Sequence, residues 1–146
     1  MNVVTYPNVK EGLKSWLSDL PELATFVGDS NDHVFYRVPD KAPWPIVVIV
    51  GPVGGGPLSG DAPVDAPWFQ FDCWGQPTDA GRQPREKQAA DLSLLVQGAL
   101  MGLQGRTRID DMNVLWANVI SRLPAPDPES GQARYIVTAE ISAIAA

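Results

Sequence analysis

The stretch that decides the fold is WFQFDCW at residues 68–74. Successive side chains of a β-strand point to opposite faces of its sheet, so this run separates into two sets. Phe69, Phe71 and Cys73 are predicted to face the core. The other, wetter face is predicted to carry Trp68, Gln70, Asp72 and Trp74. Such a strand predicts a sheet with one covered face and one accessible face.

After this strand the sequence predicts one long helix and two further strands. The helix is expected to begin near Pro84 and to end at Gly105, because proline suits the first turn and glycine suits a terminator. Its apolar residues recur three and four positions apart and form one stripe, namely Leu92, Leu95, Val96, Ala99, Leu100 and Leu103. The strands are predicted at 114–123 and 134–142, separated by a proline-rich turn.

Both later strands alternate, and the alternation assigns their side chains to faces. In the first, one set is Val114, Trp116, Asn118, Ile120 and Arg122, predicted to share the wetter face. In the second, one set is Tyr135, Val137, Ala139 and Ile141, opposite Arg134, Ile136, Thr138, Glu140 and Ser142.

The first half of the chain predicts a helix and two strands. A helix is expected to start at Pro7-Asn8 and to end or kink at Pro21, followed by a short helical turn as far as Val27. Strands are expected at 33–38 and 46–50. Residues 51–67 contain many glycines and prolines and predict a long loop, either functional or disordered.

These elements predict an α+β fold in a single domain spanning residues 1–146. We expect a two-layer sandwich in which two main helices pack on one face of a mostly antiparallel sheet of about four to five strands.

Composition excludes several classes of protein. The formal net charge of −6 argues against a surface built to hold nucleic-acid phosphates. No apolar run approaches the ~20 residues of a membrane-spanning helix, so no membrane partner is expected. The one cysteine, Cys73, rules out an internal disulfide and a cysteine-based metal cluster.

No segment predicts catalysis or a cofactor. The glycine-rich run after Gly51 lacks the Gly-Lys-Ser/Thr ending of a phosphate loop. His33 is the only histidine and is expected to be a surface or strand-end residue. Asp110 and Asp111 contain the oxygens that a hard cation prefers, but adjacent carboxylates are more typical of a solvated turn. We therefore expect neither an enzyme nor a metal site.

The tryptophans on the wetter strand face suggest an interface instead, because aromatic side chains concentrate binding energy between proteins. A shift of one residue in register would reverse this assignment. The predicted subunit or partner interface consists of Trp68, Gln70, Asp72, Trp74, Trp116, Asn118 and Arg122.

Four segments, taken in order, resemble one family. They are the Leu-x-x-Trp-Leu helix at 13–17, the extended WPIVV entry at 44–48, the FQFDCW strand at 69–74 before an Ala/Leu-rich helix, and PDPESG at 126–131 leading into RYIV at 134–137. Together they resemble the tail completion or tail terminator proteins of long-tailed bacteriophages, over roughly residues 9–144.

The resemblance implies a structural virion protein. Such proteins assemble as a homo-oligomer, a hexameric ring, at the head-proximal end of the tail tube. Their partners are the tail tube protein and the head–tail connector or adaptor, and DNA only passes through the ring. The resemblance implies assembly in the host cytoplasm and a final place in the tail or neck.

Two alternatives remain open at this point. One is a head completion or connector adaptor protein of the neck, which would bind the portal side rather than the tube. The other is a small intracellular ligand-binding module with the Gly/Pro segment as a lid, which would form an apolar pocket and a stable monomer.

Overall fold

A computed structural model describes residues 3–58, 60, 62–78, 85–105 and 107–146. Within these residues the chain forms three helices and six strands. The helices are α1 (Val9–Ser18), α2 (Pro21–Val27) and α3 (Glu86–Met101). The strands are β1 (Val34–Phe35), β2 (Ile46–Pro57), β3 (Asp65–Trp74), β4 (Thr107–Ile109), β5 (Met112–Pro124) and β6 (Arg134–Ala145).

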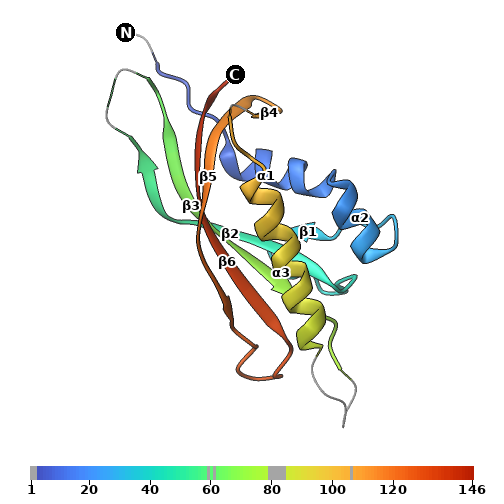
Figure 1. Ribbon diagram of the computed structural model, residues 1–146. Coiled ribbons are helices and arrows are strands. Elements are labelled where there is room, and N and C mark those ends of the chain that lie inside the picture. The colour runs from blue at the N-terminus through green and yellow to red at the C-terminus, as the bar shows by residue number, and fades with distance from the viewer. Residues whose placement is uncertain (1–2, 59, 61, 79–84, 106) are drawn as a thin grey trace.

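All six strands form one sheet in the order β1-β2-β3-β6-β5-β4. The pair β1–β2 is parallel, and the other neighbouring pairs are antiparallel. The sheet curls like half of a barrel, and the three helices lie on one side of it (Figure 1). Helix α3 packs against β3, β5 and β6, whereas α1 contacts β1, β2 and β4.

The predicted two-layer sandwich of about four to five antiparallel strands with two helices is therefore wrong. The sheet has six strands and is mixed, and a third helix is present. The strand predicted at 33–38 is present only as the two residues of β1. Strand β4, of three residues, was not predicted, because it is too short to produce a recognisable alternation. Pro21 does not merely end α1 but occupies the first turn of α2, where the missing N–H of proline costs no hydrogen bond.

The start of α1 follows the sequence prediction. Asn8 is the N-cap, and its Oδ1 accepts from the backbone N–H of Glu11 at 3.2 Å. The side-chain amide of Asn8 also donates to the Glu11 carboxylate at 3.2 Å. The two residues therefore cap the helix jointly. For α3, the described helix begins at Glu86, and the predicted start at Pro84 lies outside the described residues.

One hydrophobic core lies between the helices and the sheet. The predicted inward set, Phe69, Phe71 and Cys73, is confirmed: all three belong to this core. From β6 the core receives Val137, Ala139, Ile141 and Ala143. From the helices it receives chiefly Val9, Leu13, Leu17, Leu23, Leu92, Val96 and Leu100.

The prediction of a loop at residues 51–67 is wrong for most of its length. Strand β2 continues to Pro57 and β3 begins at Asp65, so the two strands form a long hairpin that projects away from the helices (Figure 1). Pairing shifts register between Val50 and Gly54 and then continues. Cross-strand hydrogen bonds therefore order a segment whose composition is typical of loops.

Strand β5 contains two register shifts, between Val114 and Trp116 and between Val119 and Ser121. Each irregularity moves the following side chains to the other face. The predicted alternation of this strand is consequently correct only between the shifts. Val114, predicted on the wetter face, is fully buried in the core.

A smaller hydrophobic cluster lies on the other face of the sheet. It contains Ile46, Val48 and Trp74, with Phe35 and Trp44 packed against them. The rings of Trp44 and Trp74 lie 5.9 Å apart between centroids at an angle of 58°. The segment that follows β1 thus covers one end of this face, and the remainder stays open.

Candidate functional site

The open face is the part of the sheet that neither the helices nor the segment after β1 covers. Along its centre, Trp68 of β3 pairs with Glu140 of β6, and Glu140 pairs with Asn118 of β5. The next row joins Gln70 to Thr138 and Ser121. Four predicted interface residues therefore share the open face, namely Trp68, Gln70, Trp116 and Asn118.

A single carboxylate joins the two exposed tryptophans of this face. The indole N–H of Trp68 donates to Oε2 of Glu140 at 3.2 Å, and that of Trp116 donates to Oε1 at 3.3 Å. Trp68 is 38% exposed and Trp116 is 39% exposed. We call these three residues the tryptophan clamp. Three adjacent strands hold it, so its geometry depends on the sheet rather than on a loop.

Two glycines of the hairpin leave space for the indole ring of Trp68. Gly54 pairs with Trp68, and a methyl group on Gly54 would lie 3.5 Å from Cε3 of the indole. On Gly55 it would lie 2.9 Å from Cδ1 of the same ring and would overlap the carbonyl oxygen of Ala66. The ring therefore lies close to a strand that has no side chain there.

Two other predicted interface residues are engaged inside the protein. The Arg134 guanidinium lies 4.6 Å from the Trp74 ring centroid, and its Nη1 is 3.9 Å from Oδ2 of Asp72. Arg134 also donates through Nε to the carbonyl of Ala125 at 2.7 Å. Burial raises the pKa of Asp72, an effect that the Arg134 charge partly offsets. Asp72 and Trp74 belong to the closed end of this face.

The seventh predicted residue, Arg122, lies on the helix side. It pairs with Val137, a core residue, because the second register shift in β5 reverses the side chains that follow it. Its Nη1 donates to Oγ of Ser93 at 3.1 Å, and its guanidinium lies 5.3 Å from the ring centroid of Tyr135. The structure thus separates Arg122 from the tryptophan clamp.

Glu140 is the residue of this candidate site that sequence reasoning missed. The alternation of residues 134–142 put Glu140 opposite the set that contains Val137 and Ile141, but nothing indicated that it lies between two tryptophans. That knowledge requires the strand order, in which β6 lies between β3 and β5.

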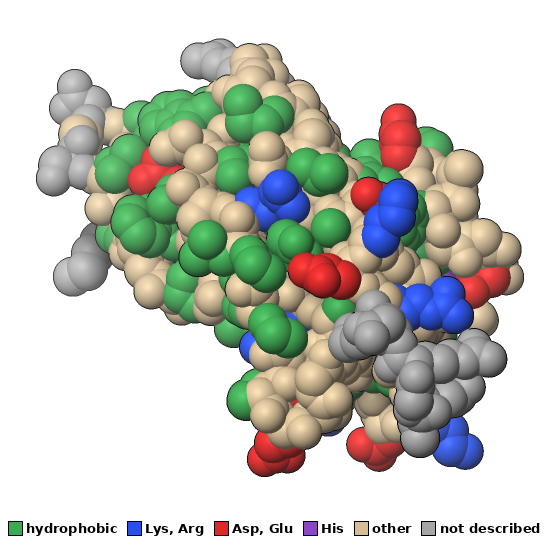
Figure 2. All heavy atoms as spheres, turned by 60° about the horizontal axis from the view of Figure 1, so that its bottom comes forward, with side chains coloured by type: hydrophobic (Ala, Val, Ile, Leu, Met, Phe, Trp, Pro, Cys, Tyr) green, Lys and Arg blue, Asp and Glu red, His purple; other side chains and the backbone are tan. Residues whose placement is uncertain are grey.

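The molecular surface agrees with an interaction role. Hydrophobic side chains gather in the left and middle of the view in Figure 2, on the side where Figure 1 shows the β2–β3 hairpin, and most charged side chains lie toward the other edges. The exposed large hydrophobic residues of β2, β3 and β5 are Val53, Trp68, Trp116, Ile120 and Leu123. Contiguous exposed apolar surface commonly marks a contact with another protein.

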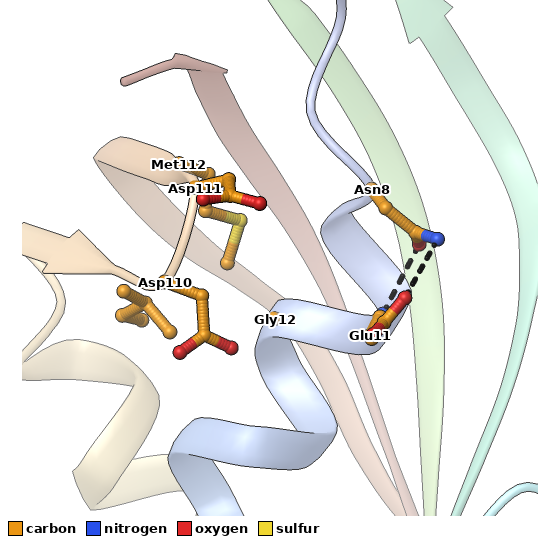
Figure 3. Close-up of a pocket in the computed structure, with 7 residues that line it drawn as sticks. Asn8, Glu11, Gly12, Asp110, Asp111 and Met112 are labelled. Carbon is orange, nitrogen blue, oxygen red and sulfur yellow. Dashed lines mark hydrogen bonds between the residues drawn. The ribbon is translucent and has the colours of Figure 1, made fainter.

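An acidic turn joins β4 to β5. Asp110 and Asp111 form the turn beside a cavity of about 250 Å³ near the N-terminus of α1. Figure 3 shows Glu11 directed toward Asn8 and away from both aspartates. Among the described residues, no group of three His, Cys, Asp or Glu side chains is arranged to bind a metal ion.

His33 is buried, so the predicted surface position is wrong. It directly precedes β1, which agrees with the predicted position at the end of a strand. It is 3% exposed, with Nδ1 2.7 Å from the carbonyl oxygen of Pro45 and Nε2 2.6 Å from Oδ1 of Asp29. The contact with His33 is the main cause that lowers the pKa of Asp29. His33 therefore ties the loop after α2 to the start of β2.

Replacing His33 with alanine is expected to lower the free energy of unfolding by about 1–3 kcal/mol, because the buried Pro45 carbonyl loses its partner. Urea denaturation measures this change. The control is Asp40→Ala, at an exposed position in the next loop. Equal stability of the two variants would show that the His33 contacts do not hold this loop.

Along the part of the chain that the structure describes, no helix combines the length and the apolar character needed to cross a bilayer.

Comparison with known families gives one positive finding. Residues 11–142 match the model of a family described as Tail completion protein gp17. A search of curated proteins gave no match.

Proposed function

The chain belongs to the phage tail completion protein gp17 family, and from this premise we propose that it forms a ring at the head-proximal end of the tail tube. In this role the ring ends polymerisation of the tube and joins the tail to the head connector. The protein acts by binding and not by catalysis. The family match over residues 11–142 is the observation that carries the proposal.

The open face and the hairpin support an assembly role. The face carries exposed aromatic side chains on rigid strands, a common composition for protein contacts. The β2–β3 hairpin extends from the body and can reach a neighbouring subunit (Figure 1). A contact between two different surfaces of identical chains closes into a ring when the rotation between neighbours is suitable. The proposed ring is a hexamer.

The charge of the chain supports passage of DNA without retention. With 17 acidic and 11 basic residues in each chain, a ring of six copies carries a net negative charge. Phosphates are attracted to dense Lys and Arg and not to such a surface. DNA is therefore a molecule in transit, whereas the tube protein and the head connector are the binding partners.

The test is electron microscopy of particles produced by a phage whose gene for this protein is deleted. We expect headless tails of irregular or excessive length beside DNA-filled heads without tails. Tails of normal length that fail to join heads would instead assign the protein to the connector side, as a neck adaptor. Intact, infectious virions would refute both assembly roles. Restoring the gene on a plasmid is the control.

A further inference from the structure

The tryptophan clamp has the chemistry of a cation-binding site. Each oxygen of the Glu140 carboxylate accepts one indole N–H, and each keeps a further lone pair for another donor. The two indole rings are more than one-third exposed and offer the negative faces that attract cations. A carboxylate flanked by two tryptophans therefore favours a positively charged group.

Nothing in the described part of the chain neutralises this carboxylate. The ion pairs found there join Lys14 to Asp32, His33 to Asp29, Lys87 to Asp91 and Arg134 to Asp72, and none involves Glu140. Arg134, the cation on the same side of β6, is already bound to the Ala125 carbonyl and lies over Trp74. Glu140 thus presents a charge that its own surroundings leave without a counterion.

Arginine fits the clamp better than lysine. Its planar guanidinium stacks on an indole while its N–H groups point outward in the plane toward a carboxylate. The Trp68 ring packs closely on Gly54 and Gly55 before any ligand binds. Binding of an arginine therefore costs little conformational entropy of this side chain. The neighbouring Gln70, Asn118 and Thr138 can form hydrogen bonds to the backbone of the arriving segment.

The net charge of the chain indicates which kind of protein supplies the arginine. A second copy carries a net charge of −6, so it offers Glu140 less long-range attraction than a basic protein does. A basic partner is attracted instead. We propose that the tryptophan clamp binds an arginine side chain on a basic segment of a different protein. That this partner belongs to the tail rests on the function proposed above.

The first experiment measures the chemistry of the clamp directly. The probe is N-acetyl-arginine amide, added to the protein while NMR records the indole N–H signals of Trp68 and Trp116. N-acetyl-citrulline amide is the matched control, because it has nearly the same shape without the charge. Both indole signals are expected to shift with the arginine probe, and the apparent affinity is expected to fall as salt rises.

The variant for this experiment is Glu140→Gln, which keeps the size of the side chain. It is expected to weaken binding of the arginine probe by about tenfold, since a charge-assisted contact is lost. An equal response to citrulline, or unchanged arginine binding in the variant, would overturn the proposal. An unchanged melting temperature shows that the variant is folded.

The second experiment separates a different protein from a second copy. Glu140→Arg is compared with Glu129→Arg, which introduces the same charge in the exposed turn before β6. Self-association, measured by analytical ultracentrifugation, is expected to be the same in both variants. Complementation of the deletion phage is expected to fall at least about tenfold only with Glu140→Arg. Loss of self-association with Glu140→Arg alone would assign the arginine to a second copy and overturn the proposal.

The titration does not depend on the proposed function. Intact virions from the deletion phage would refute a role in tail assembly, whereas the response of the clamp to arginine over citrulline would still hold. Conversely, if the clamp does not bind the arginine probe, the electron microscopy of the deletion phage still tests the proposed role in tail assembly.

Discussion

Replacing Leu100 with alanine is expected to lower the free energy of unfolding by about 2–5 kcal/mol. Leu100 is fully buried where α3 packs on the sheet, and close-packed neighbours fill only part of the cavity that alanine leaves. Urea denaturation followed by circular dichroism measures the loss. A large loss supports the packing of α3 as the main contact between helices and sheet.

The same helix provides the matched control. Leu94 is 49% exposed, so Leu94→Ala removes the same atoms without opening a cavity. Its effect is expected to stay within about 0.5 kcal/mol of the parent protein. If the two variants lose equal stability, α3 does not present to the sheet the face described here.

Replacing Gly55 with alanine is expected to lower the free energy of unfolding by about 2–4 kcal/mol. Gly55 has a φ of 72°, a left-handed conformation that costs other residues roughly 1–2 kcal/mol. The added methyl group also overlaps the backbone of Ala66, which cannot move as a side chain can, and crowds Trp68. The outer part of the β2–β3 hairpin should separate, with a change in tryptophan fluorescence.

Gly54→Ala is the control for this variant. Gly54 does not have a positive φ, and its added methyl group would make ordinary contact with Trp68 at 3.5 Å. We expect a change below about 1 kcal/mol and an unaltered fluorescence spectrum. Similar losses of stability in the two variants would mean that glycine is needed there only for general flexibility, and not for the close contact with Trp68.

Side-chain alternation predicted the faces of β3 correctly and separated the residues of β6 into the correct two sets, because the pairing of these strands with each other contains no register shift. Phe71 and Val137 illustrate this success, since both are fully buried on the helix side. Strand β5 shows the limit. Its two register shifts come from local backbone geometry, and a sequence pattern of period two does not reveal them. The alternation therefore predicted the wrong face for Arg122.

Composition was misleading in the segment after Gly51. Glycine and proline are typical of loops, yet antiparallel pairing with β3 extends β2 as far as Pro57. The pairing is a tertiary contact that composition does not encode. The same reason explains the missed role of Glu140, because two tryptophans distant in sequence reach it only through the strand order.

The burial of Cys73 has a practical consequence for chemistry in solution. Its thiol is inaccessible beneath the helices, and burial raises its pKa, so almost no reactive thiolate forms at neutral pH. Maleimide reagents should therefore leave the native protein unmodified. A cysteine introduced at any exposed position becomes the single reactive thiol without removal of the native one. Fluorophores and cross-linkers can then be placed residue by residue to map the neighbours of each surface.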